Sequence, residues 1–124
     1  MSGYVVNIEE KTEQNEFFRQ VLFTTKRSQL VVMALQPGED IGAEVHEDHD
    51  QFIRGEVGDG KAIMDGVESD LGDGSAVVIP AGVDHNIINT GDTVMKLYTV
   101  YTPPEHIDGT VHQTKAEALA DHHE

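Results

Sequence analysis

The clearest signal for the fold lies in residues 74–89, GSAVVIPAGVDHNIIN. Its first half, SAVVI, is an apolar run rich in β-branched residues, which predicts a short strand. Pro80 and Gly82 then favour a tight turn, because proline fixes φ and glycine tolerates left-handed backbone. His85 opens a second apolar run that ends at Asn89. The stretch therefore predicts two strands joined by a turn, with a histidine at the start of the second strand.

A second informative block, GEDIGAEVHEDHDQFIRGEVG, covers residues 38–58. Glu44 and His46 are two positions apart, so both side chains would point to the same face of a strand. Gln51 follows the polar stretch EDHD, which predicts a turn, and it could return on an adjacent strand toward the same point. The sequence thus predicts that these three side chains lie near one another, with His85 as a candidate fourth member.

Short apolar runs separated by glycine, aspartate and proline continue along the chain. Repeated short strands with regular turn signals predict an all-β sandwich or barrel. Helical character is expected only near residues 13–19 and in the tail 114–122, where KAEALA favours a helix. His122 and His123, at the C-terminal end, are expected to be disordered. The expected strands cover residues 4–8, 20–25, 29–36, 61–66, 75–80, 85–89 and 93–103.

The composition excludes several classes of function. The chain has 23 acidic and 8 basic residues and a formal net charge of −15, so phosphate backbones and anionic membranes would repel it. It has no cysteine, which excludes disulfides and thiolate metal sites. No signal peptide and no membrane-spanning apolar run is visible. We therefore expect one acidic, soluble, cytoplasmic domain over residues 1–124 that binds a small molecule rather than nucleic acid or membrane.

Together, the two blocks resemble the paired motifs of the cupin superfamily. The likeness is to small single-domain cupins of the conserved-barrel type, which are often labelled mannose-6-phosphate isomerase-like. The resemblance implies a jelly-roll β-barrel, which here would carry a short C-terminal helix. Residues 74–89 match the second motif at Gly74, Pro80, Gly82, His85 and Asn89, and residues 38–58 match the first at Gly38, His46 and Gly58.

The first block departs from the family pattern at two metal-ligand positions. Glu44 stands where the family has the first histidine of a His-x-His pair, and Gln51 stands where it has a glutamate. The ligand set implied by the resemblance is therefore Glu44, His46, Gln51 and His85, with His49 as an alternative ligand. Two nitrogens and two oxygens suit Zn, Mn, Fe or Ni rather than a soft metal. Glu44 could instead be an exposed strand carboxylate, and Gln51 a hydrogen-bonding pocket residue without a metal.

Three further residues are left with open roles. Arg54 could bind a carboxylate or phosphate of a substrate, although a surface salt bridge is the commoner role for such a residue. His106 and His112 lie in a proline-containing tail that should cross the barrel as a loop, and solvent exposure is their default interpretation. The candidates for inward-facing residues are Phe52 or Ile53, Met64, Ile79, Ile87, and Tyr98 or Tyr101.

The leading functional hypothesis is a metal-dependent enzyme, isomerase-like, acting on a sugar, sugar phosphate or related small polar substrate. A divalent ion would polarise a substrate carbonyl, and Glu44, where it is not a ligand, could act as the catalytic base. The alternatives are a binding or sensor cupin that does not convert its ligand, and a cupin dioxygenase, because fold does not decide reaction class. By analogy with cupins of this size, we expect a homodimer.

Overall fold

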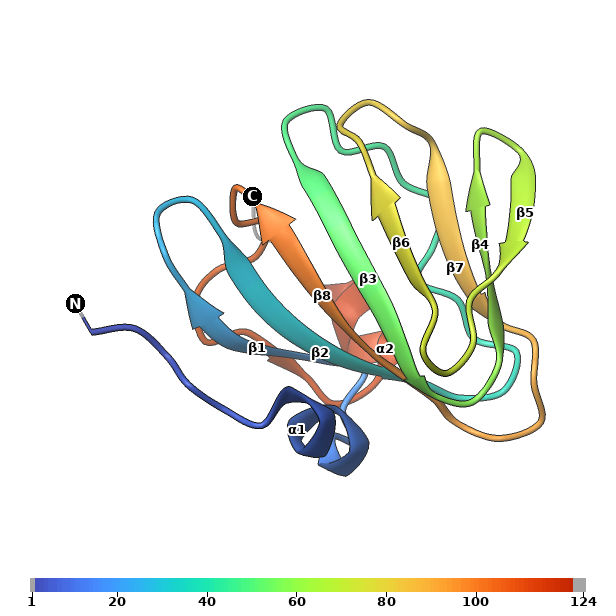
Figure 1. Cartoon of the computed structure of the whole chain (residues 1–124), viewed down its shortest axis with the longest axis horizontal. Helices are drawn as coiled ribbons and strands as arrows, with labels where there is room; N and C mark the ends of the chain where they lie inside the picture. Colours follow the sequence, from blue (N-terminus) through green and yellow to red (C-terminus); the bar gives the residue numbers. More distant parts are fainter. Residues whose placement is uncertain (1, 122–124) are drawn as a thin grey trace.

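The computed structural model describes residues 2–121, in which two antiparallel β-sheets face each other (Figure 1). The larger sheet has six strands in the order β6-β3-β8-β2-β1-β9, and the smaller has three in the order β5-β4-β7. This is the all-β jelly-roll barrel that the sequence predicts, with the expected short C-terminal helix. His122 and His123 lie outside the described residues. The elements are α1 (Ile8–Gln14), β1 (Arg19–Thr24), β2 (Gln29–Leu35), β3 (Asp50–Val57), β4 (Gly60–Met64), β5 (Val67–Asp70), β6 (Ala76–Ile79), β7 (His85–Asn89), β8 (Met95–Thr102), β9 (Val111–His112) and α2 (Lys115–Ala120).

The N-terminal segment differs from its prediction. Residues 4–7 join neither sheet, and Ile8 begins helix α1 instead of ending a strand. The reason is local: the Asn7 side chain accepts a hydrogen bond from the Glu10 amide at 3.0 Å, which is the bond of a helix N-cap. The helical turn predicted for residues 13–19 is therefore displaced toward the N-terminus.

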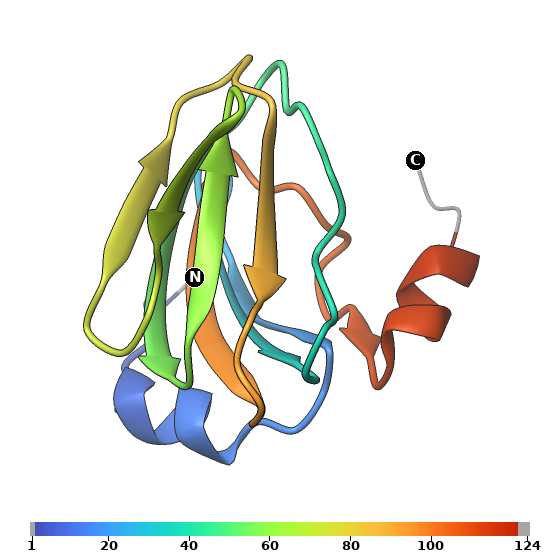
Figure 2. The same ribbon diagram turned by 90° about the vertical axis from the view of Figure 1, so that its right-hand side faces the viewer.

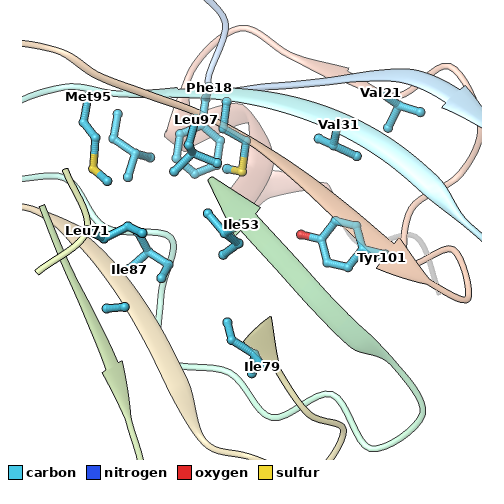
Figure 3. Packing of buried hydrophobic residues seen from close by; sticks show 13 residues of the cluster. Phe18, Val21, Val31, Ile53, Leu71, Ile79, Ile87, Met95, Leu97 and Tyr101 are labelled. Atoms are coloured by element: carbon cyan, nitrogen blue, oxygen red, sulfur yellow. The ribbon is translucent and has the colours of Figure 1, made fainter. Parts of the chain in front are cut away.

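One end of the barrel interior is apolar. Inward-facing residues of β2 and β8 pair across the sheet, with Leu35 opposite Met95 and Met33 opposite Leu97. All four side chains are fully buried, and Leu71 packs in the same cluster (Figure 3). Burial of these side chains supplies the main favourable free energy of folding.

The other end of the interior is polar. Along the same strands, Gln29 of β2 lies opposite Tyr101 of β8, which lies opposite Gln51 of β3. Thr99, also fully buried, is two residues before Tyr101. The Tyr101 hydroxyl points into the interior (Figure 3). Polarity thus changes along one continuous sheet face.

The glycines of both sequence motifs serve the backbone. Gly38, Gly58, Gly74 and Gly82 all have φ between 82° and 86°, a region that residues with a side chain rarely adopt. At Gly58 a Cβ atom would also lie 2.6 Å from the carbonyl oxygen of Val94. These motif positions are therefore required by the turns and by close backbone approach, not by ligand binding.

The C-terminal tail leaves β8 and crosses to the edge of the larger sheet next to β1. There β9 pairs with β1, and helix α2 lies outside the sheets, on the same side as the connection formed by residues 36–49 (Figure 2). The Thr114 hydroxyl caps α2 by accepting a hydrogen bond from the Glu117 amide at 3.2 Å. Among residues 2–121, no helix has the length and apolarity needed to cross a membrane.

Candidate metal centre

Three of the predicted side chains converge at the polar end of the barrel. Glu44 and His46 come from the connection between β2 and β3, and His85 begins β7. One potential ligand atom from each residue lies within 4.8 Å of the others. The sequence predicted that Glu44 and His46 lie on one strand, but they do not lie on a regular strand. Instead the Glu44 amide donates to the His85 carbonyl at 2.8 Å and the His85 amide donates back at 2.9 Å, and this bridge brings the two segments together.

The two imidazoles are oriented by hydrogen bonds at Nδ1. His46 Nδ1 lies 2.8 Å from Glu105 Oε2, and His85 Nδ1 lies 2.9 Å from the Val83 carbonyl oxygen. Since both partners are acceptors, each Nδ1 carries a proton, and in the neutral ring Nε2 then offers a lone pair. Metal-binding histidines are commonly held in this way by a carboxylate or a backbone carbonyl.

The donor set fits a divalent metal. His46 Nε2 is buried, makes no hydrogen bond and lies 3.6 Å from Glu44 Oε2. The His46 and His85 rings are 5.2 Å apart between centroids. Two imidazole nitrogens and a carboxylate are ligands that Zn, Mn, Fe and Ni accept. Glu44, His46 and His85 could therefore hold such an ion, with room for further ligands.

Glu105 belongs to the site, although it is not part of any sequence motif. Besides binding His46, its carboxylate lies 3.3 Å from His49 Nε2, while His49 Nδ1 lies 2.7 Å from the Pro103 carbonyl oxygen. Both nitrogens of His49 are thus engaged in the tail that follows β8, and His49 lies outside the ligand cluster. The structure supports a positioning role for His49 rather than the alternative ligand role.

Gln51 lies inside the barrel, as predicted, and is 3% exposed. Its Nε2 donates to the Thr99 hydroxyl at 3.0 Å, whereas its Oε1 is buried and accepts no hydrogen bond. A buried acceptor without a donor is unfavourable in the protein alone. Oε1 is therefore available to a ligand, and its role as a fourth metal ligand stays a prediction.

The protonation equilibria of the site are shifted by its own groups. The hydrogen bond to Glu105 raises the pKa of His46, and the same bond lowers the pKa of Glu105. Burial raises the pKa of Glu44, although 37% of its side chain is exposed at the pocket.

A cavity of about 370 Å³ adjoins the centre. The sequence predicted that His112, which lines this cavity, would be exposed to solvent, and that prediction was wrong. His112 is only 5% exposed, since β9 pairs with β1, and the His106 ring lies edge-on to Tyr101 at 5.2 Å between centroids. The cavity is lined by Phe18, Arg19, Ile41, Glu44, Glu105, His106, His112, Lys115, Ala118, Leu119 and Asp121.

Arginine placement also decides between the two roles considered for Arg54. Its Nε lies 2.7 Å from Glu56 Oε1, and 42% of its side chain is exposed, so it forms the surface salt bridge. The arginine that lines the cavity is Arg19. The sequence did not single out Arg19, because it precedes an ordinary apolar strand and carries no motif.

The comparisons with known proteins agree with this geometry. A family model described as "Cupin domain" matches residues 31–101. The uncharacterized protein YrkC of Bacillus subtilis (strain 168) is 50% identical over 123 residues, which cover 94% of this chain and 66% of YrkC. This chain therefore spans just under two thirds of the length of YrkC.

Two solved structures are similar in three dimensions. The crystal structure of BH2720 from Bacillus halodurans is 44% identical with a TM-score of 0.94, covering 97% of this chain and 96% of that one. A predicted oxalate decarboxylase from Thermotoga maritima is 25% identical with a TM-score of 0.60, covering 64% of this chain and 69% of that one.

Proposed function

This chain belongs to the cupin family, and from that premise we propose that it is a small metal-dependent enzyme. The ion would be a divalent transition metal held by Glu44, His46 and His85, with Gln51 as a fourth ligand. The substrate would be a sugar, sugar phosphate or related small polar molecule, and the reaction isomerase-like. The mannose-6-phosphate isomerase-like group that the motifs resemble supports this choice.

One observation carries the metal proposal. Both imidazoles use Nδ1 for a hydrogen bond to an oxygen, which leaves Nε2 of each ring for a ligand, and potential ligand atoms of Glu44, His46 and His85 lie within 4.8 Å of one another. A purely structural histidine cluster has no need for a buried Nε2 that lacks a hydrogen bond, as His46 has. The arrangement is explained when a cation completes it.

The chemistry needs one group that polarises a carbonyl and one that moves a proton. A divalent ion, when bound, supplies the first as a Lewis acid. Among the protein groups, Glu44 suits the second, because burial raises its pKa and it lines the cavity. If Glu44 binds the ion instead, proton transfer falls to a neighbouring imidazole of the cavity, such as His106.

Metal analysis tests the first part of the proposal. Protein purified without chelators, then exposed to each of Mn, Fe, Ni and Zn and desalted, should retain close to one equivalent of at least one metal. The double variant His46→Gln/His85→Gln should retain none, whereas His112→Gln, outside the cluster, should retain the wild-type amount. Less than a tenth of an equivalent in the wild type would overturn the proposal.

The variant Glu44→Gln separates the two roles of Glu44. Retained metal with abolished turnover would identify the base, and lost metal would identify the ligand. Turnover is sought by screening sugars, sugar phosphates and sugar acids by thermal shift, followed by product analysis of each compound that stabilises the protein. Stabilisation without any product would point to a binding or sensor cupin.

We also propose that the chain forms a homodimer. Its described surface offers apolar area for an interface: Val5 is 100% exposed, and Val78 on β6 is 63% exposed. Phe52 and Tyr98 lie on the same outer face of the larger sheet, with ring centroids 6.2 Å apart. Sedimentation at twice the monomer mass is expected, and at monomer mass the dimer would be excluded.

A further inference from the structure

We propose that Arg19 binds a carboxylate of the substrate, so that the molecule held in the cavity is a small polyhydroxy acid rather than a neutral sugar. This inference rests on the proposed function for the metal centre but adds its own site, on a different strand. Arg19 opens β1, whereas the metal cluster comes from residues 44–46 and from β7.

Arg19 is a buried charge with unused donors. It is 8% exposed, and its Nε is buried without a hydrogen bond. Its Nη1 lies 3.2 Å from His112 Nδ1, while His112 Nε2 lies 2.8 Å from Asp121 Oδ2. Since arginine only donates, His112 Nδ1 is the acceptor in this hydrogen bond, and Nε2 is the nitrogen that faces Asp121. His112 therefore binds Arg19 without neutralising it.

The carboxylates of the cavity are committed to other groups. Glu105 pairs with His46 and His49, and Asp121 pairs with His112. The second cation of the cavity, Lys115, pairs with Asp40 outside the lining. Across residues 2–121, no carboxylate lies within salt-bridge distance of Arg19. Glu44 acts on Arg19 electrostatically but forms no salt bridge with it, so this buried guanidinium keeps donors that an arriving anion would satisfy.

The cavity joins Arg19 to the metal centre. Arg19 and Glu44 line the same space of about 370 Å³, which suits a small ligand. The Arg19 guanidinium lies 5.2 Å from the centroid of the Phe18 ring, and such a contact holds the planar group in one orientation. One molecule could therefore place an acid group on Arg19 and its hydroxyl oxygens beside Glu44, the member of the metal centre that lines the cavity.

The cavity favours a carboxylate over a phosphate. A phosphate ester carries up to two charges and binds best to several cations, but of the two Lys and Arg residues in the described lining, Lys115 is paired with Asp40 and Arg19 alone has no salt bridge. Three carboxylates, Glu44, Glu105 and Asp121, also line the space and would repel a dianion more strongly than a monoanion. A planar carboxylate matches the paired donors of a guanidinium.

Binding of three matched compounds tests the inference. Gluconate, sorbitol and sorbitol 1-phosphate share one carbon skeleton and differ only in the group at carbon 1. Calorimetry on the metal-loaded and the chelator-treated protein should show gluconate binding about 10- to 100-fold more tightly than sorbitol, the range expected for hydrogen bonds between charged groups. Arg19→Gln should reduce this ratio to about one and leave sorbitol affinity unchanged, whereas Lys115→Gln should preserve it.

A measurement on the wild type guards against loss of folding in Arg19→Gln. The chain has three arginines, Arg19, Arg27 and Arg54, so its Nε–Hε nuclear magnetic resonance signals can be assigned with Arg27→Gln and Arg54→Gln. Gluconate should shift the Arg19 signal alone. Shifts of no arginine signal, equal affinity for gluconate and sorbitol, or preference for sorbitol 1-phosphate would each overturn the inference.

The two proposals can fail separately. If the protein retains metal but does not prefer gluconate to sorbitol, the Arg19 inference is wrong and the metal centre stands. If the protein retains no metal but gluconate binds in an Arg19-dependent manner, the metal proposal is wrong and the anion site stands. A purely structural Arg19 that only anchors the tail would lower the melting temperature on substitution and show no preference for the acid.

Discussion

The two ends of the barrel interior use the same strands for opposite purposes. At one end Met33, Leu35, Met95 and Leu97 are fully buried and apolar. At the other end the same β2, β8 and β3 present Gln29, Tyr101 and Gln51, and the metal cluster and Arg19 lie nearby. The change takes place within a few residues of each strand, while β2 and β8 keep one pairing register from Gln29 to Leu35.

This difference in polarity indicates that the apolar end stabilises the fold and that the polar end is arranged for binding. The apolar end removes side chains from water, and its Met and Leu side chains have no polar group that needs a hydrogen-bond partner. The polar end holds buried atoms without hydrogen bonds, namely Arg19 Nε, His46 Nε2 and Gln51 Oε1, and such atoms lower stability. Conflicts of this kind between polarity and burial are expected at functional sites.

Truncating a side chain at the apolar end should have the largest effect. Leu97→Ala removes a side chain that is 0% exposed, so we expect the free energy of unfolding to fall by about 2–5 kcal/mol from lost burial and the cavity left behind. Urea unfolding of chelator-treated protein measures it. Val67→Ala on β5, at a position 66% exposed, is the control and should change stability by less than about 0.5 kcal/mol. A loss below about 1 kcal/mol for Leu97→Ala would contradict this division of the barrel.

At the polar end, Glu105→Gln should affect binding rather than folding. The carboxylate fixes the His46 ring through a 2.8 Å hydrogen bond, and loss of such a partner typically lowers metal affinity about 10- to 100-fold. Competition with a fluorescent chelator measures this affinity. Glu47→Gln, an exposed residue of the same connection, should leave it unchanged. Equal affinities for wild type and Glu105→Gln would show that Glu105 does not support the site.

The sequence was more informative about the barrel than about its cavity. Alternating apolar residues and turn-forming glycines predict most strands, because these signals are local. The Glu44, His46 and His85 cluster was predicted through motif spacing. Arg19 and Glu105 could not be found in this way, since they reach the site only after β9 pairs with β1 and the tail folds back along the barrel. The prediction of a strand over residues 4–8 was wrong, because the capping hydrogen bond at Asn7 favours a helix there despite the β-propensity of the segment.

Metal uptake at the polar end should depend on pH. The hydrogen bond to Glu105 raises the pKa of His46 above 6.5, and a cation can bind Nε2 only after its proton leaves. Apparent affinity should therefore fall about tenfold per pH unit below that raised pKa and level off above it. In Glu105→Gln the decline should begin at lower pH, because the group that raises the pKa is gone. Affinity that is constant between pH 5 and pH 8, about the range of an ordinary histidine titration, would exclude His46 as a ligand.

Gln51→Leu provides the smallest and sharpest test of the difference between the two ends. The substitution keeps a side chain of similar size but removes an acceptor without a donor, and it also removes the bond to Thr99. Because these two changes oppose each other, the free energy of unfolding should change by less than about 1 kcal/mol. Metal affinity should nevertheless fall about tenfold, since the proposed fourth ligand is lost.

The same variant can separate two interpretations of this end. If Gln51→Leu is much more stable and binds metal as well as the wild type, Gln51 Oε1 is not a ligand and its burial serves some other group in the cavity. If it is destabilised as strongly as Leu97→Ala, the polar end contributes to the core in the same way as the apolar end. Only unchanged stability together with weakened metal binding means that the polar row is kept for the ligand, because a residue that served folding alone could not lower affinity without lowering stability.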